Sequence, residues 1–214
     1  MSVIRQPGVL GRTTRRRVVG VSVAFVAAAV ETLAVGVWFL LLVSSPSTST
    51  ALAGLGILFC GSLLRTGLFG VATSDLDELI RPWRLGAALA MTAGWVVWLF
   101  VAQSIGGPIG LAVATLVLVG ALVAQFLFER YVFRLRPPAQ LEVTPILSAT
   151  LLALGGAALL ASVWFVDLAL VSPPISIDTT TLVVRIEAIQ LAAVAFGVLA
   201  FVAHQRRFQR LLES

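Results

Sequence analysis

The sequence lacks lysine and asparagine, and it contains only one histidine, His204, and one cysteine, Cys60. Without lysine there is no amine for a Schiff base to retinal or pyridoxal phosphate. One histidine and one cysteine are too few for the usual haem, zinc or iron–sulfur sites. A single cysteine also excludes an intramolecular disulfide, and the absence of asparagine excludes N-glycosylation. We therefore expect no metal site and no cofactor.

Charge is also scarce, since only 12% of the 214 residues are charged while 59% are hydrophobic. The mean hydropathy is +1.02. Soluble domains carry about a quarter charged residues, and a water-soluble chain of this size could not bury so much apolar surface. The composition predicts an integral membrane protein.

Apolar runs of about twenty residues predict transmembrane helices, because that length crosses the hydrocarbon core. The sequence contains six such runs: Val18–Val43, Ala51–Val71, Trp83–Gln103, Ile109–Phe128, Thr144–Leu170 and Leu182–Ala203. We predict an all-α bundle of six transmembrane helices within residues 18–205, flanked by basic tails at 1–17 and 206–214. No soluble domain is expected.

Arginine predicts the orientation of these helices. Thirteen of the fifteen arginines fall in the two tails and in the second and fourth connections, which lie on one side if the helices alternate. Cytoplasmic loops collect positive charge. Both termini are therefore expected in the cytoplasm of a multi-pass cell-membrane protein. We expect seven arginines to contact anionic lipid headgroups, a simpler partner for them than nucleic acid: Arg15, Arg16, Arg17, Arg134, Arg136, Arg206 and Arg207.

Polar residues inside the predicted spans need a partner or a purpose, because charge in hydrocarbon is costly. At about 1.5 Å per residue, five of them are expected in one layer in the outer half of the membrane. The layer comprises Glu31, Asp167, Arg185, Glu187 and Gln190. It is either a structural network or a transport or relay site, and we favour the structural interpretation.

Specific pairings follow from depth along the helices. Asp167 and Arg185 are at matched depth on consecutive helices, so an ion pair is predicted. Arg65 either extends its side chain to the cytoplasmic headgroups or pairs with Glu129. His204 begins the basic C-terminal tail and is expected at the membrane interface.

Small residues spaced four apart permit close packing of helix backbones. The longest such stripe, on the fifth helix, comprises Ala149, Ala153, Ala157 and Ala161. We expect small-residue faces of this kind to pack against a second copy of the chain or a partner membrane subunit.

The sequence carries no nucleophile elbow, Walker loop or dinucleotide fingerprint, so an enzyme is not expected. Three functions remain open. We favour a non-catalytic structural or accessory subunit of a membrane assembly. The alternative is a small proton- or cation-linked transporter or channel that uses the outer-half layer, and the third is an intramembrane lipid enzyme.

Overall fold

The computed structural model describes residues 7–44, 46–73, 82–132, 143–177 and 180–213. The helices in these ranges are α1 (Pro7–Ser44), α2 (Thr48–Thr73), α3 (Pro82–Ile105), α4 (Gly107–Val132), α5 (Val143–Trp164) and α6 (Ala188–Glu213). All six are long and apolar enough to cross a membrane. The prediction of six helices with the length and apolarity of membrane spans is confirmed.

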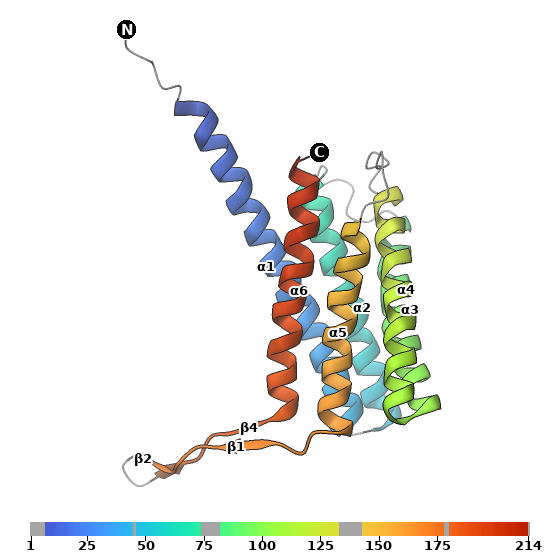
Figure 1. The fold of residues 1–214 in the computed structure, drawn as a ribbon, viewed down its shortest axis with the longest axis vertical. Helices are drawn as coiled ribbons and strands as arrows, with labels where there is room; N and C mark the ends of the chain where they lie inside the picture. Colours follow the sequence, from blue (N-terminus) through green and yellow to red (C-terminus); the bar gives the residue numbers. More distant parts are fainter. Residues whose placement is uncertain (1–6, 45, 74–81, 133–142, 178–179, 214) are drawn as a thin grey trace.

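The helices stand side by side in one bundle, with the start of α1 and the end of α6 at the same end (Figure 1). Helix α6 packs against α1 and α5, α1 packs against α2, and α3 and α4 complete the bundle. Helices α3 and α4 are joined by the tightest turn, in which Gly106 and Gly107 have φ of 72° and 60°. Positive φ at both positions favours glycine.

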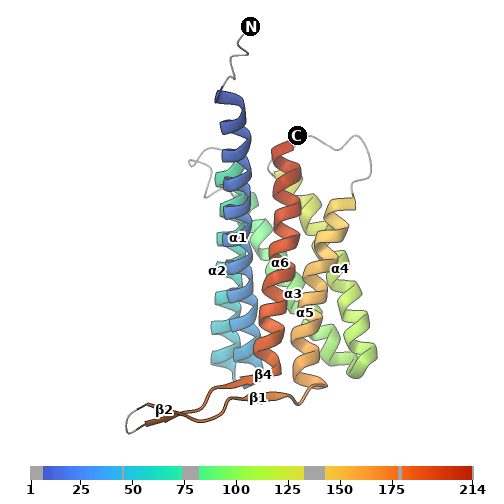
Figure 2. The same cartoon turned by 60° about the vertical axis from the view of Figure 1, so that its left-hand side comes forward.

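A two-stranded ribbon joins α5 to α6 and extends from the end of the bundle opposite the start of α1 (Figure 2). Strand β1 (Ala169–Val171) pairs with β4 (Arg185–Glu187), and β2 (Ile175–Ile177) pairs with β3 (Thr180–Leu182), both antiparallel. Between the pairs, the N–H of Ser172 donates to the carbonyl of Val184.

The ribbon corrects two predicted helix boundaries. The fifth helix ends at Trp164 instead of Leu170, and the sixth begins at Ala188 instead of Leu182. Apolarity alone suggested longer helices here. Segment 169–187 is rich in Val, Ile and Thr, which favour strands, and its Pro173-Pro174 pair opposes helix.

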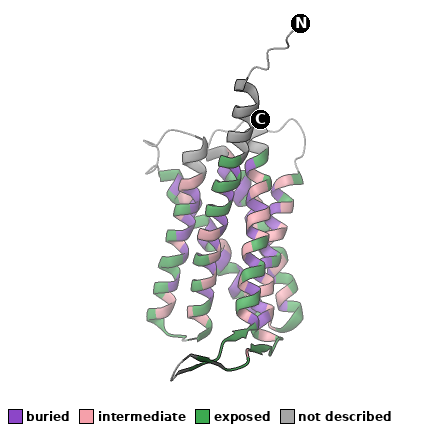
Figure 3. Cartoon of the chain, turned by 90° about the vertical axis from the view of Figure 1, so that its left-hand side faces the viewer, coloured by how far each residue is buried: buried purple, intermediate pink, exposed green. Residues whose placement is uncertain are grey.

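The burial pattern suits a bundle in lipid, because buried residues face the interior and apolar residues also cover the outside (Figure 3). The core contains Trp95, Trp98 and Phe196, with Trp95 packed edge-on against the other two rings. On the outer surface, Phe100 and Leu116 are at least 70% exposed. Exposed apolar side chains of this size are expected where lipid, not water, is the solvent.

Small residues bring the helices together inside this single chain. A Cβ added to Gly61 of α2 would lie 2.2 Å from the Cβ of Ala34 on α1, so the two helices touch there. On α5, Ala149 and Ala153 are fully buried against the rest of the bundle. This half of the α5 stripe therefore packs within the chain and is not available to a second subunit, contrary to the sequence-based prediction.

Candidate functional site

A buried polar cluster lies in the half of the bundle nearer the start of α1 and the end of α6. We call it the inner network. It consists of Glu31 on α1, Arg65 on α2, Gln125 and Glu129 on α4, and His204 and Arg207 on α6. Its members come from four helices, so the network is assembled only when the bundle folds.

Glu129 is the centre of the inner network. Arg65 donates through Nη2 to one carboxylate oxygen, and Arg207 donates through Nη2 to the other at 2.6 Å. Gln125, one helical turn before Glu129, donates through Nε2 to the same carboxylate at 3.2 Å and to the carbonyl of Ala87 on α3 at 2.8 Å. The side chains of Arg65 and Glu129 are only 1% and 2% exposed. Charge-assisted hydrogen bonds of this kind offset part of the cost of burying the ions.

The two guanidinium groups also contact an aromatic ring. The Cζ atom of Arg207 lies 3.8 Å from the centroid of Phe126, and that of Arg65 lies 5.9 Å from it. The face of an aromatic ring attracts a cation, and more strongly where water is excluded. Phe126 therefore provides an apolar wall that still stabilises positive charge.

Glu31 and His204 form a further buried contact of the inner network. Oε2 of Glu31 lies 2.6 Å from Nε2 of His204, and both side chains are buried. The hydroxyl of Ser148 on α5 donates to the carbonyl of Ala203, the residue before His204, at 3.1 Å. The contact between Glu31 and His204 ties α1 to α6.

The position of Glu31 contradicts the predicted outer-half layer. At about 1.5 Å per residue, Glu31 lies about 20 Å from the C-terminal end of its helix at Ser44. The prediction had placed it about 10 Å from that side of the hydrocarbon core. The prediction subtracted the distance from Val18 from a hydrocarbon core of about 30 Å, but the apolar part of α1 runs from Val18 to Ser44, and Glu31 lies at its middle. Glu31 therefore joins the inner network and is separated from the other four residues.

The remaining residues of the predicted layer gather at the ribbon instead. One shallow cavity of about 290 Å³, beside the C-terminal end of α1, is lined by Asp167, Arg185 and Glu187. The side chains of Arg185 and Glu187 form an ion pair at 3.2 Å and are 64% and 52% exposed. Gln190 accepts a hydrogen bond from the N–H of Glu187 at 2.9 Å, which caps the start of α6.

The predicted pair between Asp167 and Arg185 is wrong, because within the described ranges Arg185 pairs with Glu187. The strand register explains this result. Arg185 lies opposite Val171, whereas Asp167 precedes β1 and lies outside the paired segment. The prediction assumed that Asp167 and Arg185 lie at the same depth on two helices, but neither residue is in a helix.

Two further expectations about α6 are corrected. His204 is fully buried instead of interfacial. Arg207 was expected at lipid headgroups, but its side chain is 10% exposed and bound to Glu129. Arg206 is exposed at the end of the bundle, as a headgroup contact requires. The other predicted headgroup residues have side chains outside the described part of the chain: Arg15, Arg16, Arg17, Arg134 and Arg136.

The spacing of polar residues in the sequence was a signal for the inner network, and the prediction did not use it. Gln125 and Glu129 are four apart and His204 and Arg207 are three apart, so each pair shares one helix face. Arg65 had been matched with Glu129 as one of two alternatives, and the structure selects that alternative. Spacing within one helix could not predict the contacts between helices that are far apart in the chain.

Among the residues that the structure describes, no three His, Cys, Asp or Glu side chains lie close enough to hold a metal ion. In comparisons with known proteins, no family model, no curated protein and no solved structure matches the chain. The function is therefore inferred from the geometry of the molecule.

Proposed function

We propose that this chain is a non-catalytic structural or accessory subunit of a membrane assembly, in which the inner network holds four helices in one arrangement. The observation that supports this most directly is the pairing of the buried charges with one another. Glu129 receives both arginines, and Glu31 contacts His204. Buried ionic groups cost stability but can specify one packing over its alternatives, because any other register leaves a charge unpaired.

The dimensions of the interior support the same proposal. The cavity beside Glu31 measures about 10 Å³, which is room for about one water molecule. Around it the core is filled by large side chains such as Trp38, Trp95 and Phe39, each at most 2% exposed. A substrate pathway needs a continuous polar lining, and this core is apolar between the inner network and the ribbon end of the bundle.

A second candidate function is proton-linked transport, and one observation favours it. Glu31 and His204 are titratable groups in contact inside a membrane bundle, and Glu31 also lines a cavity. Intramembrane acid–histidine pairs of this kind occur in proton relays. The outer-half layer no longer supports transport, because Glu31 lies apart from its other members.

A flux experiment separates the two functions. We expect vesicles containing the purified protein to dissipate an imposed pH gradient no faster than vesicles containing the Glu31→Gln variant, because a structural network conducts no protons. A pH-sensitive dye inside the vesicles provides the measurement, and circular dichroism confirms that both proteins are folded. Faster, pH-dependent flux in the wild-type protein that is lost in folded Glu31→Gln would replace the structural proposal with transport.

We further propose that the chain lies in the cell membrane as a multi-pass protein with both termini in the cytoplasm, and that exposed Arg206 contacts anionic headgroups there. The arginine asymmetry supports this orientation. Ser47 immediately precedes α2 and Gln209 lies near the end of α6, so the two residues lie at opposite ends of the bundle, and both are exposed.

Thiol labelling in intact cells tests the orientation. In a Cys60→Ala background, we expect an impermeant thiol reagent to label Ser47→Cys but not Gln209→Cys, because only the first faces the outside. Permeabilised cells serve as the control, since both cysteines should then react. Labelling of Gln209→Cys alone in intact cells would invert the proposed topology.

For assembly, the chain retains a small-residue face on α3. Ala90 is exposed, and a Cβ added to Gly86 would meet open space. Small residues of this kind allow a second helix to approach closely in lipid. This face replaces the α5 stripe as the proposed contact with a second copy or a partner subunit.

A further inference from the structure

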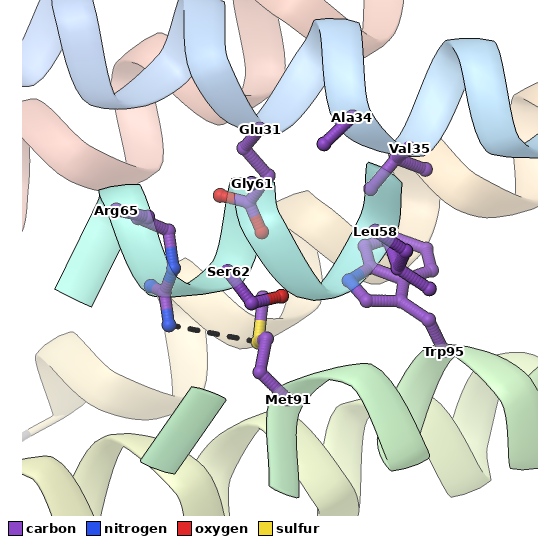
Figure 4. Close-up of a pocket in the computed structure, with 9 residues that line it drawn as sticks. All are labelled: Glu31, Ala34, Val35, Leu58, Gly61, Ser62, Arg65, Met91 and Trp95. Atoms are coloured by element: carbon purple, nitrogen blue, oxygen red, sulfur yellow. Dashed lines mark hydrogen bonds between the residues drawn. The ribbon is translucent and has the colours of Figure 1, made fainter. Parts of the chain in front are cut away.

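The small cavity beside Glu31 lies between α1, α2 and α3, next to the inner network. Figure 4 shows the carboxylate of Glu31, the hydroxyl of Ser62 and the indole of Trp95 directed toward it from these three helices. Gly61 contributes to its wall, and its contact with Ala34 holds α1 and α2 close together at that level. The cavity is therefore small because two backbones meet there, and it is polar on three sides.

Two polar atoms at this cavity have no hydrogen-bond partner among the described residues. Oε1 of Glu31 is an acceptor, and Nε1–H of Trp95 is a donor. The two residues are 3% and 0% exposed, so neither atom reaches outside solvent. A buried polar group without a partner costs about 1–3 kcal/mol. One ligand that both donates and accepts would satisfy the two atoms at once.

The size and charge of the site select that ligand. A volume of about 10 Å³ admits one water molecule and excludes larger molecules. The guanidinium of Arg65 also lines the cavity and repels a cation, whereas the carboxylate of Glu31 repels an anion. A neutral molecule with two donors and two acceptors remains.

We propose that this cavity is a binding site for a single structural water molecule, which accepts a hydrogen bond from Trp95 and donates one to Oε1 of Glu31. Its second proton is directed toward Ser62, whose hydroxyl already lies 3.4 Å from that of Thr92 on α3. The bound water completes the hydrogen bonding of Glu31, whose other oxygen contacts His204. It connects α6 through α1 to α3, to which Arg65 of the inner network already donates at the sulfur of Met91, 3.6 Å away. The water therefore adds a second side-chain contact with α3, beyond its role in the proposed function.

Magnetisation transfer from water to the tryptophan indole N–H groups tests the site in the full-length protein. Trp95 has a matched control in Trp98, which is also fully buried with an unpartnered Nε1 but does not line the cavity. The Trp95→Phe and Trp98→Phe variants assign the two signals, since each removes one indole resonance of the five. We expect a direct water cross-peak at Trp95 and none at Trp98.

Variants of Glu31 then identify the acceptor. Glu31→Gln retains a carbonyl oxygen and should keep the Trp95 cross-peak, whereas Glu31→Leu should lose it. Absence of the cross-peak at Trp95 in the wild-type protein, or equal cross-peaks at Trp95 and Trp98, would overturn the proposal. The comparison of Trp95 with Trp98 in the wild-type protein tests the proposal even if Glu31→Leu fails to fold.

Discussion

The Glu129→Ala substitution is expected to lower the free energy of unfolding by about 3–5 kcal/mol relative to the wild-type protein. The substitution removes the carboxylate that both Arg65 and Arg207 contact, and Arg65 is 1% exposed. A buried guanidinium that loses its counter-ion keeps its desolvation cost without the compensating attraction. Reversible denaturant unfolding in detergent micelles, followed by circular dichroism, measures the change.

A second glutamate in an ion pair provides the matched control. Glu187 pairs with Arg185, but both side chains are more than half exposed. Exposed pairs contribute about 0–1 kcal/mol, so Glu187→Ala should change the free energy of unfolding by no more than that. Equal losses for Glu129→Ala and Glu187→Ala would show that burial of the inner network contributes nothing to stability.

The His204→Ala variant is expected to have the second largest effect, a loss of about 2–4 kcal/mol in the free energy of unfolding. It removes the contact to Oε2 of Glu31 and leaves that carboxylate buried. It also removes the volume of a fully buried ring, so a single variant cannot separate pairing from packing.

A double-mutant cycle makes the separation. If the pair matters, His204→Ala should destabilise less in a Glu31→Gln background than in the wild-type background, with a coupling of about 0.5–3 kcal/mol. Gln190→Ala, a change in an exposed residue of the same helix, should show no coupling to Glu31→Gln. Simple additivity of the Glu31 and His204 changes would mean that the 2.6 Å contact contributes no pairing energy.

The connection between α5 and α6 shows where composition misled. Phe165–Leu170 and Leu182–Glu187 are almost as apolar as the helices that they adjoin, so a hydropathy window includes them. Strand pairing there depends on β-branched residues and on proline, which are local signals of a different kind. Both signals were present in the sequence, but the prediction followed the hydropathy and extended the two helices through these segments.

The inner network shows a different limit. Glu31 and Arg65 were recognisable as charged residues within apolar spans, and the pairing of Arg65 with Glu129, just past the fourth predicted span, was one stated alternative. Glu31 was assigned to the outer half because its distance from Val18 was subtracted from a core thickness of about 30 Å, although it lies at the middle of the apolar segment Val18–Ser44. His204 was assigned to the interface because its position in the chain adjoins the basic tail.

The sequence by itself determined that the chain forms six apolar helices, because about twenty apolar residues with little charge are stable only as a helix across lipid. It also determined that any buried charge needs a partner. Only the tertiary structure decided which partner each charge has: His204 for Glu31, and both Arg65 and Arg207 for Glu129. These contacts depend on the rotation and offset of helices about one another, which are set by packing at residues such as Gly61 and Ala34 and not by hydrophobic periodicity.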